Sequence, residues 1–224
     1  MANCLSYINY DWNDSSEFAL AADRGRARRL LIVPALFDEA NKLRRHTVEV
    51  IRRLDAAGID CLLPDLPGCG ESLSPLAEQT PSLWRAAMAA AAAHFGATQV
   101  LAIRGGAMLA PPLPGWALAP VKGASVLRQM LRARVLAARE AGREESGDAL
   151  LAEAMTSGLE LAGFQLCGAF IAEFQSLEMQ SSDLIGTIDQ SRLGGPGLWL
   201  RAEPGEDAAQ ADALAALIAK GMAA

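Results

Sequence analysis

The residues best placed to do chemistry lie in one turn, between Val100 and Gly106. A short apolar run stops there at Arg104, two glycines follow, and an apolar segment resumes. This is the strand–turn–helix pattern of the nucleophile elbow, G-x-S-x-G, in which a tight turn holds the middle residue above the end of a parallel strand. In this chain the five positions read Ala102, Ile103, Arg104, Gly105 and Gly106. The pattern predicts the turn, but an arginine stands where the nucleophile is expected.

The other members of a serine triad are also missing from the expected places. In this arrangement an acid and then a histidine follow the nucleophile along the chain. The chain has two histidines, His46 and His94, and both precede the turn. A guanidinium stays protonated at physiological pH and cannot attack a carbonyl carbon. Carboxylates do follow the apolar stretch at residues 198–201, near the expected end of the penultimate strand, at Glu203, Glu206 and Asp207. The sequence leaves open whether the protein is an enzyme.

Cys69 is a second candidate nucleophile. It lies in a turn-rich segment, residues 65–72, that would sit at the ligand-binding edge of the sheet. A thiolate beside Arg104 would have a lowered pKa and would be reactive. Because no histidine is within sequence reach, we favour the interpretation that Cys69 fills a tight turn between two glycines. Ser72 of the same turn is predicted to be a turn hydroxyl.

Arg104 itself allows two hypotheses. A buried arginine needs an acidic partner because an unpaired buried charge is costly. Arg104 would therefore pair with Asp38, Glu39 or Asp65 on a neighbouring loop and close the site. Alternatively, its guanidinium and the following backbone N–H groups would bind a small anion, a carboxylate or a phosphate. We favour the first hypothesis. The candidate binding residues on these loops are Arg104, Gly105, Gly106, Asp38, Glu39, Asn41 and Asp65.

The elements that would position these loops alternate along the chain. Continuous apolar runs predict buried strands at residues 30–33, 59–63 and 100–103, with further strands at 116–119 and 184–188. Helices are predicted over about 40–57 and 81–96, the second capped by Thr80, and residues 17–22 are predicted to be an edge strand. This alternation is typical of the α/β class, a doubly wound and mostly parallel sheet. Ligands bind such sheets at the carboxyl ends of the strands.

Residues 122–179 are predicted to form a helical cap inserted before the last strands, within a single domain that spans residues 1–224. The cap would contain helices at about 122–141, 148–157 and 169–177 and a hairpin at 159–166. The first helix has a basic face, made of Arg128, Arg132, Arg134 and Arg139. We interpret it as a solvated face; the alternative is a docking surface for an acidic partner or an anionic membrane.

The amino-acid composition argues against nucleic acid as a partner and favours a cytoplasmic location. The formal net charge of −6 argues against a general nucleic-acid binder, which needs a basic surface. The four cysteines (Cys4, Cys61, Cys69 and Cys167) form no CxxC pair, which favours a reduced, cytoplasmic protein. The first residues lack a signal-peptide pattern, and no apolar run reaches membrane-spanning length. We expect no cofactor and no metal.

Three stretches together resemble the α/β-hydrolase superfamily. They are the sequence Asp65-Leu66-Pro67-Gly68-x-Gly70-x-Ser72 after a strand, the turn at Arg104, and the cap before the last strands. The segment Asp38-Glu39-Ala40-Asn41-Lys42-x-Arg44-Arg45 is similar to the E-E-M-N-K-x-R-R segment of the exosortase-system-associated hydrolases, second type. Residues 62–72 and 159–166 also match that family, and the resemblance spans about 30–179. Cys69 and Arg104 are its most specific marks.

The resemblance implies an α/β-hydrolase fold and a cytoplasmic protein encoded beside exopolysaccharide and protein-sorting genes in a Gram-negative bacterium. It supplies no reaction. We therefore expect an accessory or binding protein without a serine triad, whose partner is a small anionic ligand or a protein of the exosortase pathway. The alternative is an active esterase, thioesterase or acyltransferase with non-standard catalytic residues such as Cys69.

Overall fold

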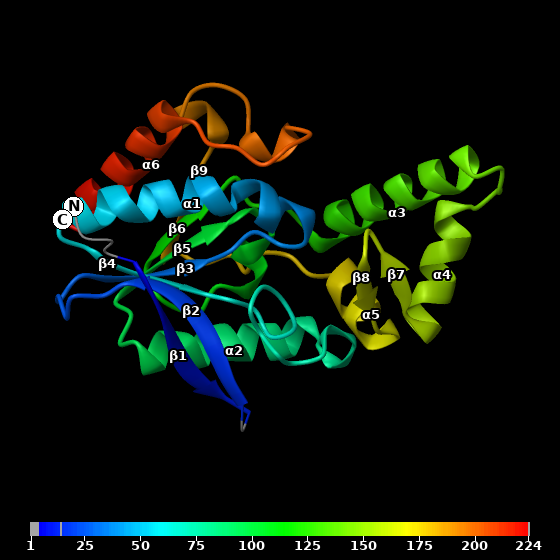
Figure 1. The fold of residues 1–224 in the computed structure, drawn as a ribbon, viewed down its shortest axis with the longest axis horizontal. Coiled ribbons are helices and arrows are strands. Elements are labelled where there is room, and N and C mark those ends of the chain that lie inside the picture. Colours follow the sequence, from blue (N-terminus) through cyan, green and yellow to red (C-terminus); the bar gives the residue numbers. More distant parts are fainter. Residues whose placement is uncertain (1–4, 14, 224) are drawn as a thin grey trace.

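The computed structural model describes residues 5–13 and 15–223, so Cys4 lies outside the described residues. Within these ranges a seven-stranded sheet runs in the order β1-β2-β4-β3-β5-β6-β9 (Figure 1). The strands are β1 (Ser6–Trp12), β2 (Ser15–Ala22), β3 (Arg29–Val33), β4 (Asp60–Pro64), β5 (Gln99–Ile103), β6 (Gly115–Leu118) and β9 (Ile185–Ile188). All neighbours from β4 to β9 pair in parallel, and β1 and β2 add an antiparallel hairpin at one edge.

The central strands are apolar throughout because both faces of the sheet are covered. In β3, Leu31 and Val33 pack into the core on one face, while Leu30 and Ile32 pack into the core on the other. All four side chains are fully buried. This is the environment that continuous apolar runs indicate in a parallel sheet, so the predicted doubly wound architecture is confirmed.

Helices cover the sheet on both faces (Figure 1). Helix α1 (Asp38–Ala56) packs beside α6 (Ala208–Gly221) on one face, and α2 (Pro81–His94) covers the other. The predicted cap of α2 is present, because Oγ1 of Thr80 accepts a hydrogen bond from the backbone N–H of Leu83 at 3.2 Å. The described residues also form four short 3-10 helices: η1 (Leu76–Glu78), η2 (Arg104–Leu109), η3 (Gln190–Arg192) and η4 (Leu198–Leu200).

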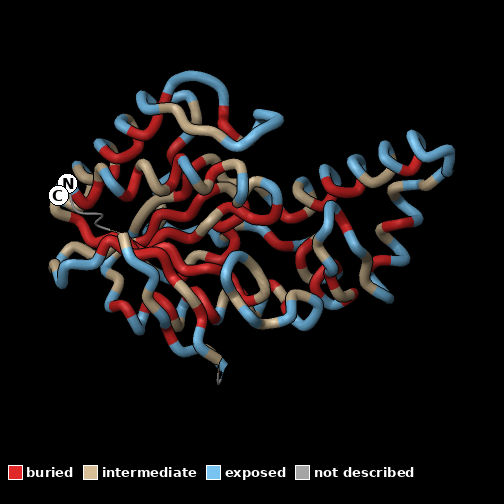
Figure 2. Tube along the Cα trace, viewed as in Figure 1, coloured by how far each residue is buried: buried red, intermediate tan, exposed pale blue. Residues whose placement is uncertain are grey.

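The predicted cap lies between β6 and β9 and projects beyond one end of the sheet (Figure 1). It contains α3 (Gly123–Glu140), α4 (Gly147–Ser157), the hairpin β7 (Leu159–Leu161) and β8 (Phe164–Leu166), and α5 (Gly168–Gln175). A Cβ atom on Gly123 would lie 1.8 Å from the carbonyl oxygen of Phe174, so the start of α3 lies directly against α5. Figure 2 shows that exposed residues predominate at the end of α3 and in α4.

Two expectations differ from the structure. Residues 17–22 lie in β2, which is not an edge strand, because β1 pairs with it on one side and β4 on the other. The polar, exposed strand β1 forms the edge instead, as is common where a sheet meets solvent. After β9 the described chain forms no further strand, so Glu203, Glu206 and Asp207 follow the 3-10 helix η4. No helix in the described ranges is both long and apolar enough to cross a lipid bilayer.

Candidate functional site at the turn after β5

The turn between β5 and η2 has the geometry that its sequence predicts. Arg104 has a φ of 54°, a left-handed conformation that is uncommon and strained for a residue with a side chain. Gly105 and Gly106 allow close packing against the loop that follows β3. A Cβ atom on Gly106 would lie 2.3 Å from the carbonyl oxygen of Pro34, and one on Gly105 would lie 2.9 Å from the Leu36 side chain. Gly106 is therefore required by this close approach, since its neighbour is a backbone atom.

The Arg104 guanidinium is held on three sides. Its Nε and Nη2 donate to the two carboxylate oxygens of Glu39 at 3.0 and 2.9 Å, a bidentate ion pair. Its Nη1 donates to the carbonyl oxygen of Ala119 at 2.8 Å. The Trp199 ring of η4 stacks on the guanidinium, with 4.1 Å from Cζ to the ring centroid. The side chains of Arg104 and Glu39 are only 13% and 12% exposed, so the pair is mostly buried.

The predicted acidic residues have different partners in the structure. Glu39, in the first turn of α1, is the acid that pairs with Arg104. Asp38 instead forms an ion pair with Lys42 at 2.8 Å on the same helix. Asp65 accepts hydrogen bonds from Nη1 of Arg44 at 2.9 Å and from the backbone N–H of Glu71 at 3.1 Å. Since the Glu39 carboxylate occupies the guanidinium fork, an outside anion would have to displace it.

Strained backbone marks the three loops that build this pair. Phe37, directly before α1, has a φ of 56°, and Ala119, directly after β6, has a φ of 42°. Together with Arg104, these residues adopt a conformation that disfavours side chains, at the carboxyl ends of β3, β5 and β6. The Ala119 carbonyl accepts a hydrogen bond from the guanidinium, and Phe37 lies two residues before Glu39, which pairs with it. Such strain persists only where surrounding contacts hold it, and it is frequent at functional sites.

A cavity of about 460 Å³ lies beside this pair, at the carboxyl ends of β3 and β4. Asn41, Arg44 and Asp65 contribute polar groups to its lining, and the walls include the aromatic rings of Phe37, Trp84 and Phe164. A smaller cavity of about 210 Å³ lies between the start of α1 and α3, lined among others by Asp38, Glu39 and Asn41. Arg104, Gly105 and Gly106 line neither cavity. The open space is therefore next to the arginine turn and not at it.

Cys69 lines the larger cavity, but its thiol lacks the lowered pKa that the alternative of a reactive thiolate requires. Burial, together with the nearby carboxylates of Asp65 and Glu17, raises the pKa of the Cys69 thiol to about 12. The lowered pKa that a thiolate beside Arg104 would have is therefore not found, because the environment of the thiol is apolar and acidic. The neighbouring Ser72 has the predicted turn role: its Oγ accepts hydrogen bonds from the backbone N–H groups of Gly68 and Ser74, at 2.8 and 3.2 Å.

The two histidines lie on helices α1 and α2, both before the turn along the chain. His46 is buried on α1, burial lowers its pKa, and its Nδ1 has no hydrogen-bond partner among the described residues. His94 is exposed at the end of α2, where its ring packs against Phe95. Two of the later acids have structural partners: Glu206 pairs with Arg45 at 2.7 Å, and Asp207 caps α6.

Sequence reasoning missed three parts of the site. Arg44 lies one helical turn after Asn41 and so shares its face of α1, which is a signal that the sequence does contain. The Ala119 carbonyl and the Trp199 ring have no comparable signal, because the chain brings them to Arg104 only through its tertiary fold. Within residues 5–13 and 15–223, no group of three or more His, Cys, Asp or Glu side chains could hold a metal ion.

The parallel sheet, the turn after β5 and the inserted cap make this an α/β-hydrolase fold. No family model matches the chain, and no curated protein matches it in sequence. Among solved structures it is similar to Est1E from Butyrivibrio proteoclasticus with ferulic acid bound, at a TM-score of 0.54 and 16% identity, covering 77% of this chain and 72% of that one.

Weaker similarity extends to other hydrolases. An esterase from Pyrococcus furiosus matches at a TM-score of 0.45 and 13% identity, covering 57% of this chain and 55% of that one. An epoxide hydrolase from Vigna radiata matches at a TM-score of 0.44 and 17% identity, covering 53% of this chain and 41% of that one. This chain thus spans about half the length of these two proteins.

Proposed function

We propose that the chain is a non-catalytic protein of the α/β-hydrolase fold that acts as a binding or accessory protein. The observation that carries the proposal is the Arg104–Glu39 ion pair at the position of the nucleophile. Its guanidinium cannot attack a carbonyl carbon, and its bidentate partner, Ala119 and Trp199 hold it in place. Arg104 then stabilises the turn and does not recognise a ligand, which is the first of the two hypotheses for this residue.

The cavity of about 460 Å³ supports a binding role. Its volume is within the range of small-molecule sites, and it combines aromatic walls with a few convergent polar groups. The Arg44 guanidinium donates one hydrogen bond to Asp65, through Nη1, and its side chain is 36% exposed. The Tyr7 side chain also interacts with Arg44, and the guanidinium N–H groups beyond these two contacts are available to a carboxylate. We infer that a small anionic ligand with an aromatic or apolar body binds here, through Arg44 and Asn41.

The resemblance of residues 38–45 and 62–72 to the exosortase-associated hydrolases supports a place for this protein in that pathway. On this proposal the protein is cytoplasmic, and its protein partner belongs to the exosortase system. The acidic net charge of −6 is in keeping with a partner other than nucleic acid.

The catalytic question is tested with a panel of short-chain p-nitrophenyl esters and thioesters. We expect no turnover above buffer for the unmodified chain and none for Arg104→Ser, because no imidazole is positioned to activate the new hydroxyl. Turnover that disappears in Cys69→Ala but persists in Cys167→Ala would contradict the proposal and establish the alternative, an active hydrolase that uses Cys69.

Ligand binding is tested separately with ferulic acid and benzoate as probes, and is followed by quenching of the tryptophan fluorescence. We expect Arg44→Gln to weaken binding about tenfold, the loss of one charge-assisted hydrogen bond. Arg45→Gln, which removes an exposed guanidinium one residue away, is the matched control. Binding that is abolished by Arg104→Lys and unchanged by Arg44→Gln would place the anion at the turn, the second hypothesis for Arg104.

A further inference from the structure

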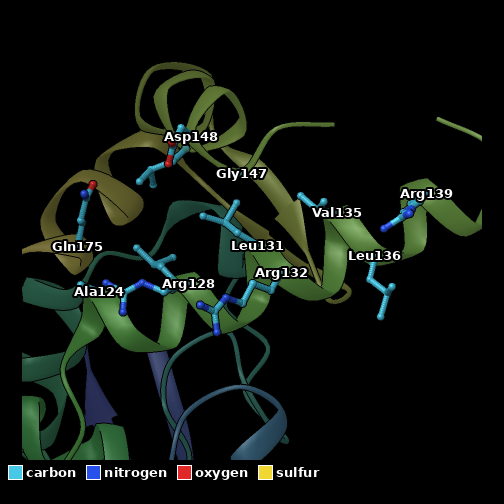
Figure 3. Close-up of a pocket in the computed structure, with 12 residues that line it drawn as sticks. Ala124, Arg128, Leu131, Arg132, Val135, Leu136, Arg139, Gly147, Asp148 and Gln175 are labelled. Atoms are coloured by element: carbon cyan, nitrogen blue, oxygen red, sulfur yellow. The ribbon is translucent and has the colours of Figure 1, made fainter. Parts of the chain in front are cut away.

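A groove on the cap lies outside the site at the turn. It has a volume of about 560 Å³ and runs between α3 and α4 (Figure 3). Its lining residues come from the two helices and from Gln175 of α5: Ala124, Leu127, Arg128, Leu131, Arg132, Val135, Leu136, Arg139, Gly147, Asp148, Leu151 and Gln175. The cavity beside Glu39 uses other residues of α3, among them Val126, Met130 and Ala133. The groove therefore opens on the opposite face of α3 and is a separate feature.

The groove has an apolar floor. Leu127 and Leu131 of α3 form part of it and are nearly buried, while Leu136 at its margin is 58% exposed. From Ala124 to Arg139 the helix extends over about 22 Å, at 1.5 Å per residue. This length and volume suit one extended long-chain acyl group, and the volume is within the range of small-molecule sites.

Three arginines line the same groove. Arg128, Arg132 and Arg139 form no ion pair with any residue that the structure describes, whereas Arg134 on the same helix pairs with Glu145 at 3.0 Å. Asp148 is the one acidic side chain in the lining. Figure 3 shows the arginines spaced along α3, with Asp148 and Gln175 across from the helix. The groove is therefore basic, in a chain whose net charge is −6.

Two further features indicate where a head group would lie. Arg128 and Arg132 are one helical turn apart, so their guanidinium groups can reach one phosphate or carboxylate together. Oε1 of Gln175 is buried, lines the groove through its residue and has no hydrogen-bond partner among the described residues. A buried acceptor without a partner is costly, and a hydroxyl of a bound head group would satisfy it.

We infer that this groove binds a monomeric single-chain amphiphile with an anionic head group. The acyl chain lies on the leucine floor between α3 and α4, and the phosphate or carboxylate lies between Arg128 and Arg132. A groove between two helices encloses a single chain, whereas a flat membrane surface would contact a convex face. The inference does not depend on the role of Arg104, because none of its residues takes part in the site at the turn.

The test is displacement of a fluorescent fatty acid, dansylamino-undecanoate, by probes kept below their micelle concentrations. We expect hexadecyl phosphate and hexadecanoate to displace it at least tenfold more effectively than hexadecyltrimethylammonium, and inorganic phosphate to have no effect. Monopalmitoyl glycerol phosphate, which carries a hydroxyl, binds more tightly than hexadecyl phosphate, and Gln175→Leu removes that difference.

Variants identify the site. The double variant Arg128→Gln/Arg132→Gln weakens anion binding at least tenfold, while Arg192→Gln, at an exposed arginine outside the cap, leaves it unchanged. Leu136→Asp abolishes binding of the fluorescent fatty acid. Leu200→Asp, at an exposed leucine of η4, leaves this binding unchanged. Both leucines are exposed, so neither change should affect folding. Equal affinity for the cationic and anionic probes, no binding at all, or binding to anionic vesicles without displacement by monomers would each overturn the inference.

Discussion

All three guanidinium nitrogens of Arg104 donate hydrogen bonds within the fold. A charged group that is nearly buried is tolerated only when its partners replace the water it loses. Glu39 supplies the opposite charge, and Ala119 and Trp199 surround the remaining edge and face. The side chain therefore acts as a structural component of the turn, and its removal leaves Glu39 buried without a counter-charge.

Arg104→Ala is predicted to destabilise the protein strongly. We expect a loss of about 2–4 kcal/mol in the free energy of unfolding, since breaking a buried ion pair leaves one charge unpaired. For a chain of this size this corresponds to a fall of roughly 5–12 °C in Tm, measured by calorimetry. Lys122→Ala breaks the exposed pair with Glu178 and should cost less than about 1 kcal/mol. Equal effects of the two substitutions would be inconsistent with a structural role for Arg104.

His46 gives a pH-dependent prediction. Burial lowers its pKa in the folded state, so between the folded value and the unfolded value of about 6.5 the unfolded state binds more protons. The contribution of His46 to stability is therefore complete above about pH 6.5 and is lost as the pH falls below it. Denaturant unfolding between about pH 7.5 and pH 5 should show a shallower loss of stability for His46→Leu than for the unmodified chain. His94→Gln is the control, and an unchanged slope in His46→Leu would contradict the prediction.

At the scale of single residues, the sequence predicts part of the site. The arginine in the nucleophile position and an acid from the set Asp38, Glu39 and Asp65 follow from residue types and loop order. Which acid pairs with Arg104 does not follow, because the three lie within reach of different basic residues. The raised pKa of the Cys69 thiol does not follow from the sequence, which shows the neighbours along the chain but not the burial of the thiol.

At the scale of elements, the turn after β5 depends on the close approach of η2 to the loop after β3. Gly106 stands at the closest point, with the carbonyl oxygen of Pro34 in the place that a Cβ would occupy. Backbone atoms cannot move aside as the end of a flexible side chain can. The turn therefore requires glycine at position 106 because of packing, and not because of a chemical role.

Gly106→Ala is therefore predicted to be much more harmful than an alanine at an open helical glycine. Overpacking a tight site costs about 1–3 kcal/mol, and a collision with backbone should reach the upper end of that range. Gly147 of α4 is the matched control, because a Cβ atom placed there would have no neighbour within 4 Å. Gly147→Ala should be neutral or stabilising by up to about 1 kcal/mol. The two free energies of unfolding, from urea titrations, decide the matter; similar values would contradict the packing argument.

The sequence predicts where helices and strands lie along the chain better than it predicts which strands pair with one another. Apolar runs locate β3, β4 and β5, and helical periodicity locates α1, α2, α3 and α4 to within a few residues, because burial on both faces or one face leaves a clear pattern. The edge hairpin is less predictable. In β1 most residues are exposed or half-buried, so its alternation is weak and the sequence alone favours β2 as the edge.

At the scale of the whole molecule, burial is uneven. The strands β3, β4 and β5 are buried almost completely, while exposed residues predominate at the end of α3 and in α4 (Figure 2). Local opening requires little free energy where few apolar contacts are lost. The cap should therefore open locally while the sheet stays intact, a property that suits a groove which admits an amphiphile.

Rates of amide hydrogen exchange are predicted to differ between the sheet and the cap. Amides in β3 and β5 should exchange only through global unfolding, whereas those in α4 and the second half of α3 should exchange faster by at least about a hundredfold. Mass spectrometry of peptides from the two regions measures the difference. Protection in α4 equal to that in β5 would show that the cap and the sheet unfold as one unit.

The central claim is that the Arg104–Glu39 ion pair stabilises the turn at the position where a nucleophile would stand. A double-mutant cycle with Arg104→Met, Glu39→Met and the double variant measures their coupling directly by denaturant unfolding. We predict a coupling energy of about 2 kcal/mol or more, with the double variant more stable than either single variant, because neither charge is left alone. Additive effects, with a coupling below about 0.5 kcal/mol, would contradict the claim.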